Sequence, residues 1–89
     1  MVERILLVEN QSGIHARPSA AIVNCLSSYN CSVKLETSTG KADARSIMEI
    51  LMLRATLESE VKVIAEGEDE EAAVNALEHL FKDHFGVKE

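Results

Sequence analysis

The spacing of hydrophobic and polar residues changes several times along the chain, and each spacing predicts one element. The apolar stretch at residues 2–8 predicts a strand, and residues 32–37 alternate as expected for a strand with one buried face. Residues 38–40 carry a hairpin signal, so a short strand over residues 41–44 should follow. Residues 60–66 alternate again, which brings the expected number of strands to four.

Two longer segments repeat their apolar residues at helical spacing. The first covers residues 16–29, and Pro18 fits only the first turn of a helix, so this helix should begin at about Ala16. The second begins in the acidic run at residues 68–71, because carboxylates stabilise the positive end of a helix dipole. Gly86 is the expected C-cap of this last helix.

A shorter helix is expected over residues 46–53. Ser46 and Glu49 have the spacing of a capping box, in which each side chain accepts a hydrogen bond from a backbone N–H of the first turn. Ile50 and Leu53 form one apolar face, which we assign to the core. The rest of the helix is also apolar, and unless a neighbouring helix covers it, the exposed part would be a docking surface. The residues expected on that surface are Ile47, Met48, Leu51 and Met52.

The elements follow one another in the order βαββαβα. Strands with a single alternating face indicate a four-stranded antiparallel sheet that is open to water on one side and covered by the three helices on the other. The chain has 89 residues, of which 46% are hydrophobic and 27% are charged. This length and composition are typical of one globular α+β domain over residues 1–89.

Charge and composition argue against several functions. Nine basic residues against 15 acidic ones give a net charge of −6, unlike a protein that binds a nucleic-acid backbone through clustered Lys and Arg. No apolar run approaches the roughly 20 residues of a membrane span, and acids on both sides of the first apolar run are unlike a signal peptide. We therefore expect a cytoplasmic protein with no nucleic-acid or membrane partner.

Neither a metal site nor a nucleotide site is expected. Cys25 and Cys31 are six residues apart, which is not a zinc-ligand spacing, so both should be reduced thiols packed as small hydrophobes. His79 and His84 are five residues apart, whereas residues four apart share a helix face. The chain has neither a Walker A sequence nor a dinucleotide fingerprint, so no cofactor is expected.

The candidate chemistry lies in GIHARPS, residues 13–19. His15 comes directly before a helix, where first-turn N–H groups and the helix dipole attract anions. Arg17 adds a planar guanidinium suited to phosphate oxygens, and Gly13 permits loop conformations that other residues avoid. Histidine in an anion site can act as a nucleophile and hold a phosphoryl group covalently. A lone histidine here would more often be a simple helix cap, but the whole motif is far more specific than a lone histidine.

This motif and the order of elements resemble HPr, the histidine-containing phosphocarrier family of the bacterial phosphoenolpyruvate:sugar phosphotransferase system. GIHARPS matches the family's phosphorylation site residue for residue, and the resemblance extends from about Val2 to Phe85. It implies an open-faced β-sandwich in which Enzyme I phosphorylates His15 at Nδ1 and the group passes to an Enzyme IIA domain. The chain would then be a covalent carrier, expected to be monomeric, without turnover of its own. The residues expected to hold the phosphate are Ser12, Ala16 and Arg17, of which Arg17 matches the family's phosphate-contacting arginine.

Residues 44–53 resemble the region around the family's regulatory serine, which HPr kinase/phosphorylase modifies in many bacteria. Ser46 is the matching position, although a helix N-cap also explains a serine there. Glu49 stands where many kinase-regulated relatives have glycine, and its carboxylate would repel a phosphate. A mainly regulatory protein, recognised through phosphorylation of His15 or Ser46, is therefore the alternative to a simple carrier.

The sequence departs from the family's pattern at several positions, and these departures affect which partners are expected. Arg54 and Glu58 replace glycines common in Gram-positive relatives, so the loop before the last strand can differ in shape. The ILML run at residues 50–53 is closer to the nitrogen-related NPr branch, which takes phosphate from a paralogue of Enzyme I. A generic α+β ligand-binding module is a third hypothesis, but it would leave GIHARPS without a role. Because family members meet both enzymes with their first two helices, we expect Ile47, Met48 and Leu51 to lie beside His15.

Overall fold

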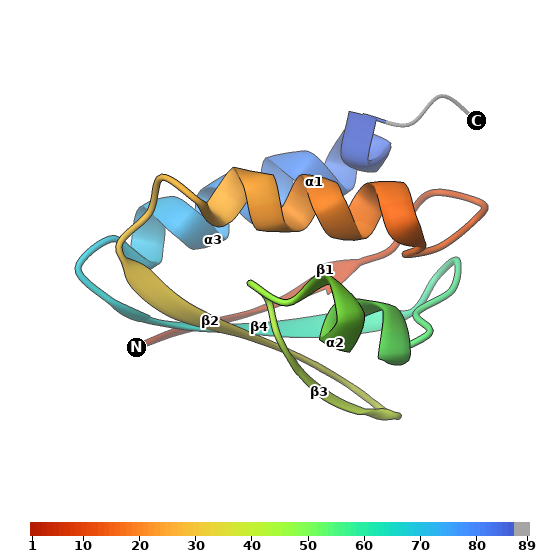
Figure 1. Ribbon diagram of the computed structural model, residues 1–89, viewed down its shortest axis with the longest axis horizontal. Coiled ribbons are helices and arrows are strands. Elements are labelled where there is room, and N and C mark those ends of the chain that lie inside the picture. The colour runs from red at the N-terminus through yellow and green to blue at the C-terminus, as the bar shows by residue number, and fades with distance from the viewer. Residues whose placement is uncertain (87–89) are drawn as a thin grey trace.

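The computed structural model describes residues 1–86 and has the predicted order of elements, closed by a short 3₁₀ turn (Figure 1). The strands are β1 (Val2–Leu7), β2 (Cys31–Thr37), β3 (Gly40–Asp43) and β4 (Glu60–Gly67). The helices are α1 (Ala16–Leu26), α2 (Ile47–Met52), α3 (Glu70–Lys82) and the 3₁₀ turn η1 (His84–Gly86).

The four strands form one antiparallel sheet in the order β1-β4-β2-β3. The strand periodicity of two decides which side chains are buried: Val61, Val63 and Ala65 of β4 all lie in the core. On the opposite face Ile5 is exposed beside Lys62, its register partner. The expectation of a sheet with one buried and one open face is confirmed.

The helices cover the buried face of the sheet (Figure 1). Helix α1 packs against both α2 and α3, and α2 also contacts β3. Pro18, Ile22 and Leu26 point from α1 into the core, as the helical spacing predicted. Ile50 and Leu53 are likewise buried, so the predicted inner face of the short helix is confirmed.

Helix α1 ends earlier than the sequence predicted, at Leu26 instead of residue 29. The reason lies in a residue from another part of the chain. The guanidinium of Arg45 donates hydrogen bonds to the carbonyl oxygens of Leu26 (2.9 Å), Tyr29 (2.7 Å) and Cys31 (2.8 Å). These carbonyls are thereby satisfied without a further helical turn.

Gly86 is not the C-cap of α3, contrary to the prediction. The helix ends at Lys82 with Asp83 as its cap, and Gly86 belongs to η1. The chain turns there because Phe85 folds back into the core, where its ring lies 4.7 Å from that of Phe81. The free energy gained by burying an aromatic side chain of this size offsets the cost of the unusual backbone conformation.

The capping box of α2 forms only in part. The Ser46 hydroxyl accepts a hydrogen bond from the Glu49 N–H (3.3 Å), as predicted. The Glu49 carboxylate, however, accepts from the Asp43 N–H (2.9 Å) and not from the Ser46 N–H. The reciprocal bond is not needed, because the Ser46 N–H already donates to the Asp43 carbonyl (3.0 Å).

The loop between α2 and β4 holds two non-glycine residues in the left-handed region, Arg54 (φ 53°) and Glu58 (φ 71°). These are the two positions at which the resemblance pointed to glycine in relatives. Their backbone therefore has the conformation that favours glycine, at some cost in strain.

Two further features concern partners and ligands. Over residues 1–86, no helix is long and apolar enough to cross a membrane, and no cluster of three potential metal ligands occurs. Cys25 and Cys31 are both thiols without a disulfide, and partial burial raises the pKa of the Cys25 thiol.

Candidate phosphorylation site

His15 is the last residue before α1, and its side chain takes no part in capping the helix. Its backbone is extended (φ −110°, ψ −159°), and the imidazole makes no capping hydrogen bond. The His15 carbonyl begins the helix instead, because it accepts from the Ser19 N–H (3.0 Å) and the Ser19 hydroxyl (2.8 Å). His15 is thus the N-cap residue by position, as the alternative interpretation expected, but its side chain is not the capping group.

One nitrogen of the His15 imidazole is enclosed by the protein. His15 as a whole is partly exposed, whereas its Nε2 atom is buried. A partner protein therefore cannot reach the imidazole through Nε2 in this conformation.

The start of α1 supplies groups that suit an anion. Ala16 and Arg17 are both exposed, and their N–H groups precede the first N–H bonded within the helix, that of Ser19. Pro18, between Arg17 and Ser19, has no N–H. The structure thus brings His15, Ala16 and Arg17 to one helix end, where partial positive charge gathers.

The loop before His15 is held against the loop that follows α2. The Ile14 N–H donates to the carbonyl oxygen of Ala55 (2.9 Å). Gly13 has φ +69°, and a Cβ there would collide with that same Ala55 oxygen and lie 2.9 Å from the Cα of Thr56. Only glycine fits both the backbone conformation and the close approach.

Asn10 also belongs to this loop, and its sequence context predicts only a turn. Its side chain is buried, and its Nδ2 donates to the Gly13 carbonyl (2.6 Å). Its own carbonyl accepts from the Gly13 N–H (3.1 Å). The available signal was an asparagine three residues before a glycine, a pairing that is common in turns.

With this geometry known, the chain can be placed among known proteins. Residues 2–83 match the family model described as the PTS HPr component phosphorylation site. The chain belongs to the HPr family of the phosphotransferase system. The phosphocarrier protein HPr of Treponema pallidum is 39% identical to it over 85 residues, which cover 96% of this chain and 97% of that protein.

Solved HPr structures share the fold. One from Thermoanaerobacter tengcongensis has a TM-score of 0.92 at 37% identity, with both chains covered completely. A structure described as an HPr dimer from the same organism has a TM-score of 0.76 at 38% identity and covers 98% of this chain and 100% of its own. The chain is thus a phosphocarrier component of the phosphotransferase system with the open-faced HPr fold.

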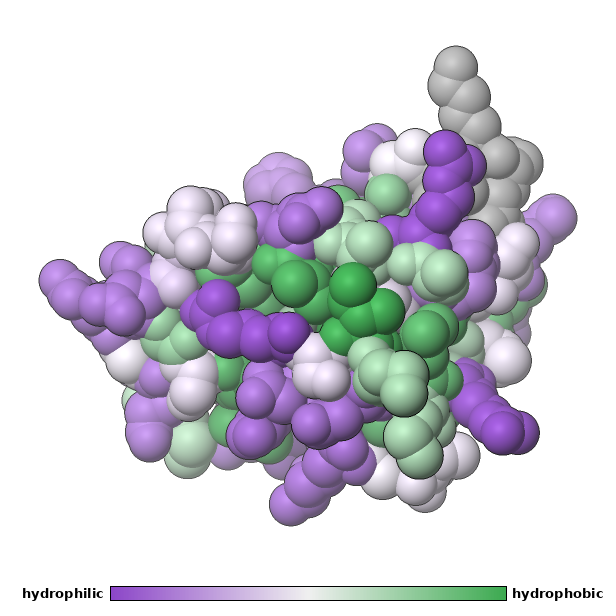
Figure 2. All heavy atoms as spheres, viewed as in Figure 1, coloured by the Kyte–Doolittle hydropathy of each residue, from purple (hydrophilic) through white to green (hydrophobic). Residues whose placement is uncertain are grey.

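The predicted docking surface of this HPr-family chain is exposed. The exposed fraction is 73% for Met48, 74% for Met52 and 41% for Ile47, and Leu51 is partly buried. Hydrophobic side chains gather over α2 on this face of the molecule (Figure 2). Helix α2 packs against α1, which His15 precedes, while the expected contact of these side chains with His15 stays a prediction.

Ser46 lies at the N-terminus of α2 in acidic surroundings. The Asp43 carboxylate accepts a hydrogen bond from the Arg45 N–H, and the Glu49 carboxylate accepts one from the Asp43 N–H. The Arg45 guanidinium points the other way, to the end of α1. A phosphate on Ser46 would thus meet two carboxylates first.

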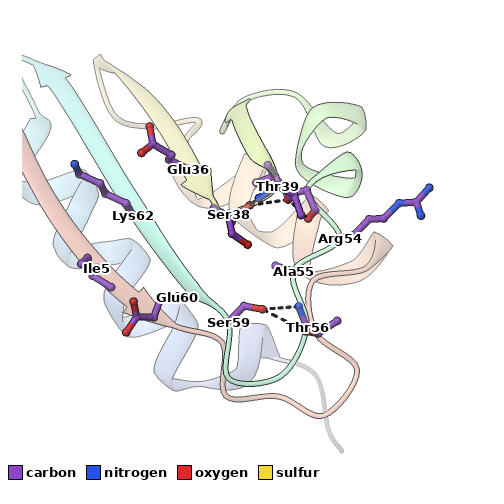
Figure 3. Close-up of a pocket in the computed structure, with 12 residues that line it drawn as sticks. Ile5, Glu36, Ser38, Thr39, Arg54, Ala55, Thr56, Ser59, Glu60 and Lys62 are labelled. Atoms are coloured by element: carbon purple, nitrogen blue, oxygen red, sulfur yellow. Dashed lines mark hydrogen bonds between the residues drawn. The ribbon is translucent and has the colours of Figure 1, made fainter.

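A hollow of about 610 Å³ lies apart from the candidate phosphorylation site. It lies between the β2–β3 hairpin and the loop after α2, and no residue of GIHARPS lines it (Figure 3). Two of its hydroxyl groups are engaged within the protein: Thr39 donates to the Leu53 carbonyl (2.7 Å), and Ser59 accepts from the Thr56 N–H (3.0 Å). These bonds brace the loop that carries Ala55.

Proposed function

We propose that this chain accepts a phosphoryl group on His15 Nδ1 from phospho-Enzyme I and donates it to Enzyme IIA domains in the cytoplasm. The observation that carries the proposal is the position of His15. It stands at the first turn of α1, within the family's motif, with an imidazole that is not used to cap the helix.

The proposed transfer is a direct displacement at phosphorus. The lone pair of Nδ1 attacks the phosphorus of the donor's phosphohistidine while the donor's P–N bond breaks, and the donor imidazole keeps the bonding electrons. Donation to Enzyme IIA is the same step in reverse direction. The buried Nε2 supports Nδ1 as the nitrogen that meets the partner.

The phosphoryl oxygens would be held by three residues. Arg17 supplies a guanidinium, the N–H groups of Ala16 and Arg17 supply the helix N-terminus, and Ser12 supplies a hydroxyl from the loop. A carrier must also release its cargo, and Arg17 and Ser12 are both exposed, so these interactions act partly through solvent and stay moderate.

The partners would dock on the apolar surface of α2. Ile47, Met48, Leu51 and Met52 offer flexible hydrophobic side chains that can adapt to more than one protein. We propose a monomer as the working form, since one chain holds the whole site. The dimer described for the relative from T. tengcongensis makes light scattering of the purified protein the appropriate check.

A mainly regulatory protein, recognised through the phosphorylation state of His15 or Ser46, is the second candidate. In its favour, Ser46 is partly exposed at a helix N-terminus. Against modification by HPr kinase/phosphorylase stand the nearby carboxylates of Asp43 and Glu49. Incubation with that kinase and ATP, on wild type and Ser46→Ala, separates the two cases.

The proposal is tested by intact mass after incubation with phosphoenolpyruvate and Enzyme I. We expect an acid-labile gain of one phosphoryl group that is absent in His15→Ala. Repeating the reaction with the nitrogen-branch paralogue of Enzyme I assigns the branch. A wild-type chain that gains no phosphoryl group with either enzyme would contradict the proposal.

A further inference from the structure

Asn10 holds both backbone groups of Gly13. The Asn10 Nδ2 donates to the Gly13 carbonyl at 2.6 Å, and the Asn10 carbonyl accepts from the Gly13 N–H at 3.1 Å. The side chain that does this is 1% exposed, so solvent does not compete for the bond. The loop over residues 10–13 is therefore closed on itself two residues before His15.

The next residues are fixed from the opposite side. The Ile14 N–H is bound by the Ala55 carbonyl, and Gly13 lies against the backbone of Ala55 and Thr56. Figure 3 shows Ala55 and Thr56 on the braced loop, beside the segment that leads to α1. Residues 13 and 14 are thus held in place by Asn10 on one side and by the loop after α2 on the other. His15 directly follows them.

The Asn10 amide is a poor choice for stability alone. Its Oδ1 is buried and accepts no hydrogen bond from any of residues 1–86. Burying an amide oxygen in this way costs stability that an apolar side chain would not cost. Residues that lower stability are expected at functional sites, where they hold other groups in the geometry that the function requires.

We propose that Asn10 is a positioning residue for phosphoryl transfer. It touches neither the phosphate nor the partner, and it acts through Gly13 by fixing where the His15 imidazole stands. In-line transfer requires the reacting atoms within a narrow range of distance and angle, so a loosened loop lowers the rate of the step. This inference rests on the proposed function of His15.

The test compares Asn10→Asp, Asn10→Ala and the matched control Gln11→Ala. Asn10→Asp keeps the shape but replaces the donor to the Gly13 carbonyl with an oxygen that repels it. Gln11 is exposed and adjacent, so its truncation removes a side chain of similar polarity without touching Gly13. Phosphoryl uptake is followed by rapid quench over a range of phospho-Enzyme I concentrations, with rates scaled to the folded fraction from circular dichroism.

We expect both Asn10 variants to lower the rate at saturating donor by roughly tenfold or more, with KM changed less than about twofold. Gln11→Ala should match wild type. Met48→Ala should show the opposite pattern, a raised KM with an unchanged saturating rate, because it removes docking surface. A role of Asn10 in stability alone predicts scaled rates equal to wild type, and that result overturns the proposal.

A measurement on the unaltered chain covers the case in which both variants unfold. The Asn10 side-chain amide and the Gly13 and Ile14 backbone amides should show hydrogen exchange at least roughly a hundredfold slower than in an unstructured peptide. Exchange at the unstructured rate would overturn the proposal. If the wild-type chain takes up no phosphoryl group at all, the proposed function fails, whatever the Asn10 variants do.

Discussion

The first two helices begin with the same backbone geometry and use their capping side chains in opposite ways. His15 and Ser46 both precede their helices in extended conformation, and the carbonyl of each accepts a bond from the fourth residue along at 3.0 Å. The Ser46 hydroxyl caps α2, whereas the His15 imidazole makes no such bond. The difference separates a helix end whose side chain caps the helix from one whose side chain does not.

The surroundings of the two ends differ in the same sense. Arg17, two residues after His15, is an exposed cation, whereas the carboxylates of Asp43 and Glu49 bond close to Ser46. We therefore expect an anion to be favoured at the start of α1 and opposed at the start of α2, although both are helix N-termini. The side chains, more than the helix ends themselves, decide which end can hold a phosphate.

The largest effect is expected from His15→Ala. Phosphoryl uptake should be lost completely, because the nucleophile is gone. The free energy of unfolding should change by less than about 0.5 kcal/mol, because the variant keeps the backbone carbonyl of residue 15 that begins the helix. Intact mass and urea denaturation measure the two quantities on the same preparation. A variant that destabilises the fold by several times that amount would show that the imidazole has a structural role.

Arg45→Ala should produce the largest loss of stability in this comparison. It removes a guanidinium that holds three carbonyl oxygens between α1 and β2. We expect a loss of roughly 2 kcal/mol, because charge-assisted bonds in a partly exposed site each contribute a fraction of their full strength. Arg45→Lys keeps the charge but not the fork of donors and should recover only part of the loss in urea denaturation.

Ser46→Ala should cost about 1 kcal/mol of stability, the usual effect of removing an N-cap hydroxyl. The rate of His15 phosphorylation at saturating donor should not change. Ser46→Thr is the control, since threonine can also cap and should keep most of the stability. Equal stability of the alanine and threonine variants would show that the long 3.3 Å bond contributes nothing.

The smallest effect is expected from Glu58→Gly, and its sign is positive. Glu58 holds φ 71°, so glycine relieves strain and should stabilise the chain by about 0.5 kcal/mol. Glu60→Gly, two residues along in β4, is the control and should destabilise, because glycine weakens a strand. Thermal denaturation of both variants checks the opposite signs.

Much of this architecture could be predicted from local pattern. Pro18 placed the start of α1 at Ala16, and alternation identified the buried positions of β4. These features depend on residues close in sequence, whose periodicity reports directly on one face of an element. The motif residues His15, Ala16 and Arg17 were also predictable, since they are consecutive.

The features that were missed depend on contacts between distant segments. Arg45 finds its carbonyl acceptors 14 to 19 residues away, and no local pattern points to them. Gly86 looked like a cap, but the burial of Phe85 against Phe81 ended the helix earlier. Asn10 gains its role only because Gly13 is pressed against Ala55, more than 40 residues along the chain.

The most direct test of the central claim is the position of the phosphoryl group within the intact protein. The measurement is a long-range ¹H–¹⁵N spectrum of the uniformly labelled chain after reaction with phosphoenolpyruvate and Enzyme I, beside the unreacted chain. We expect the nitrogen shift of His15 to change at Nδ1 to that of a phosphorylated ring, while His79 and His84 stay unmodified. A phosphoryl group on His15 Nε2, on another histidine, or on Ser46 alone would contradict it.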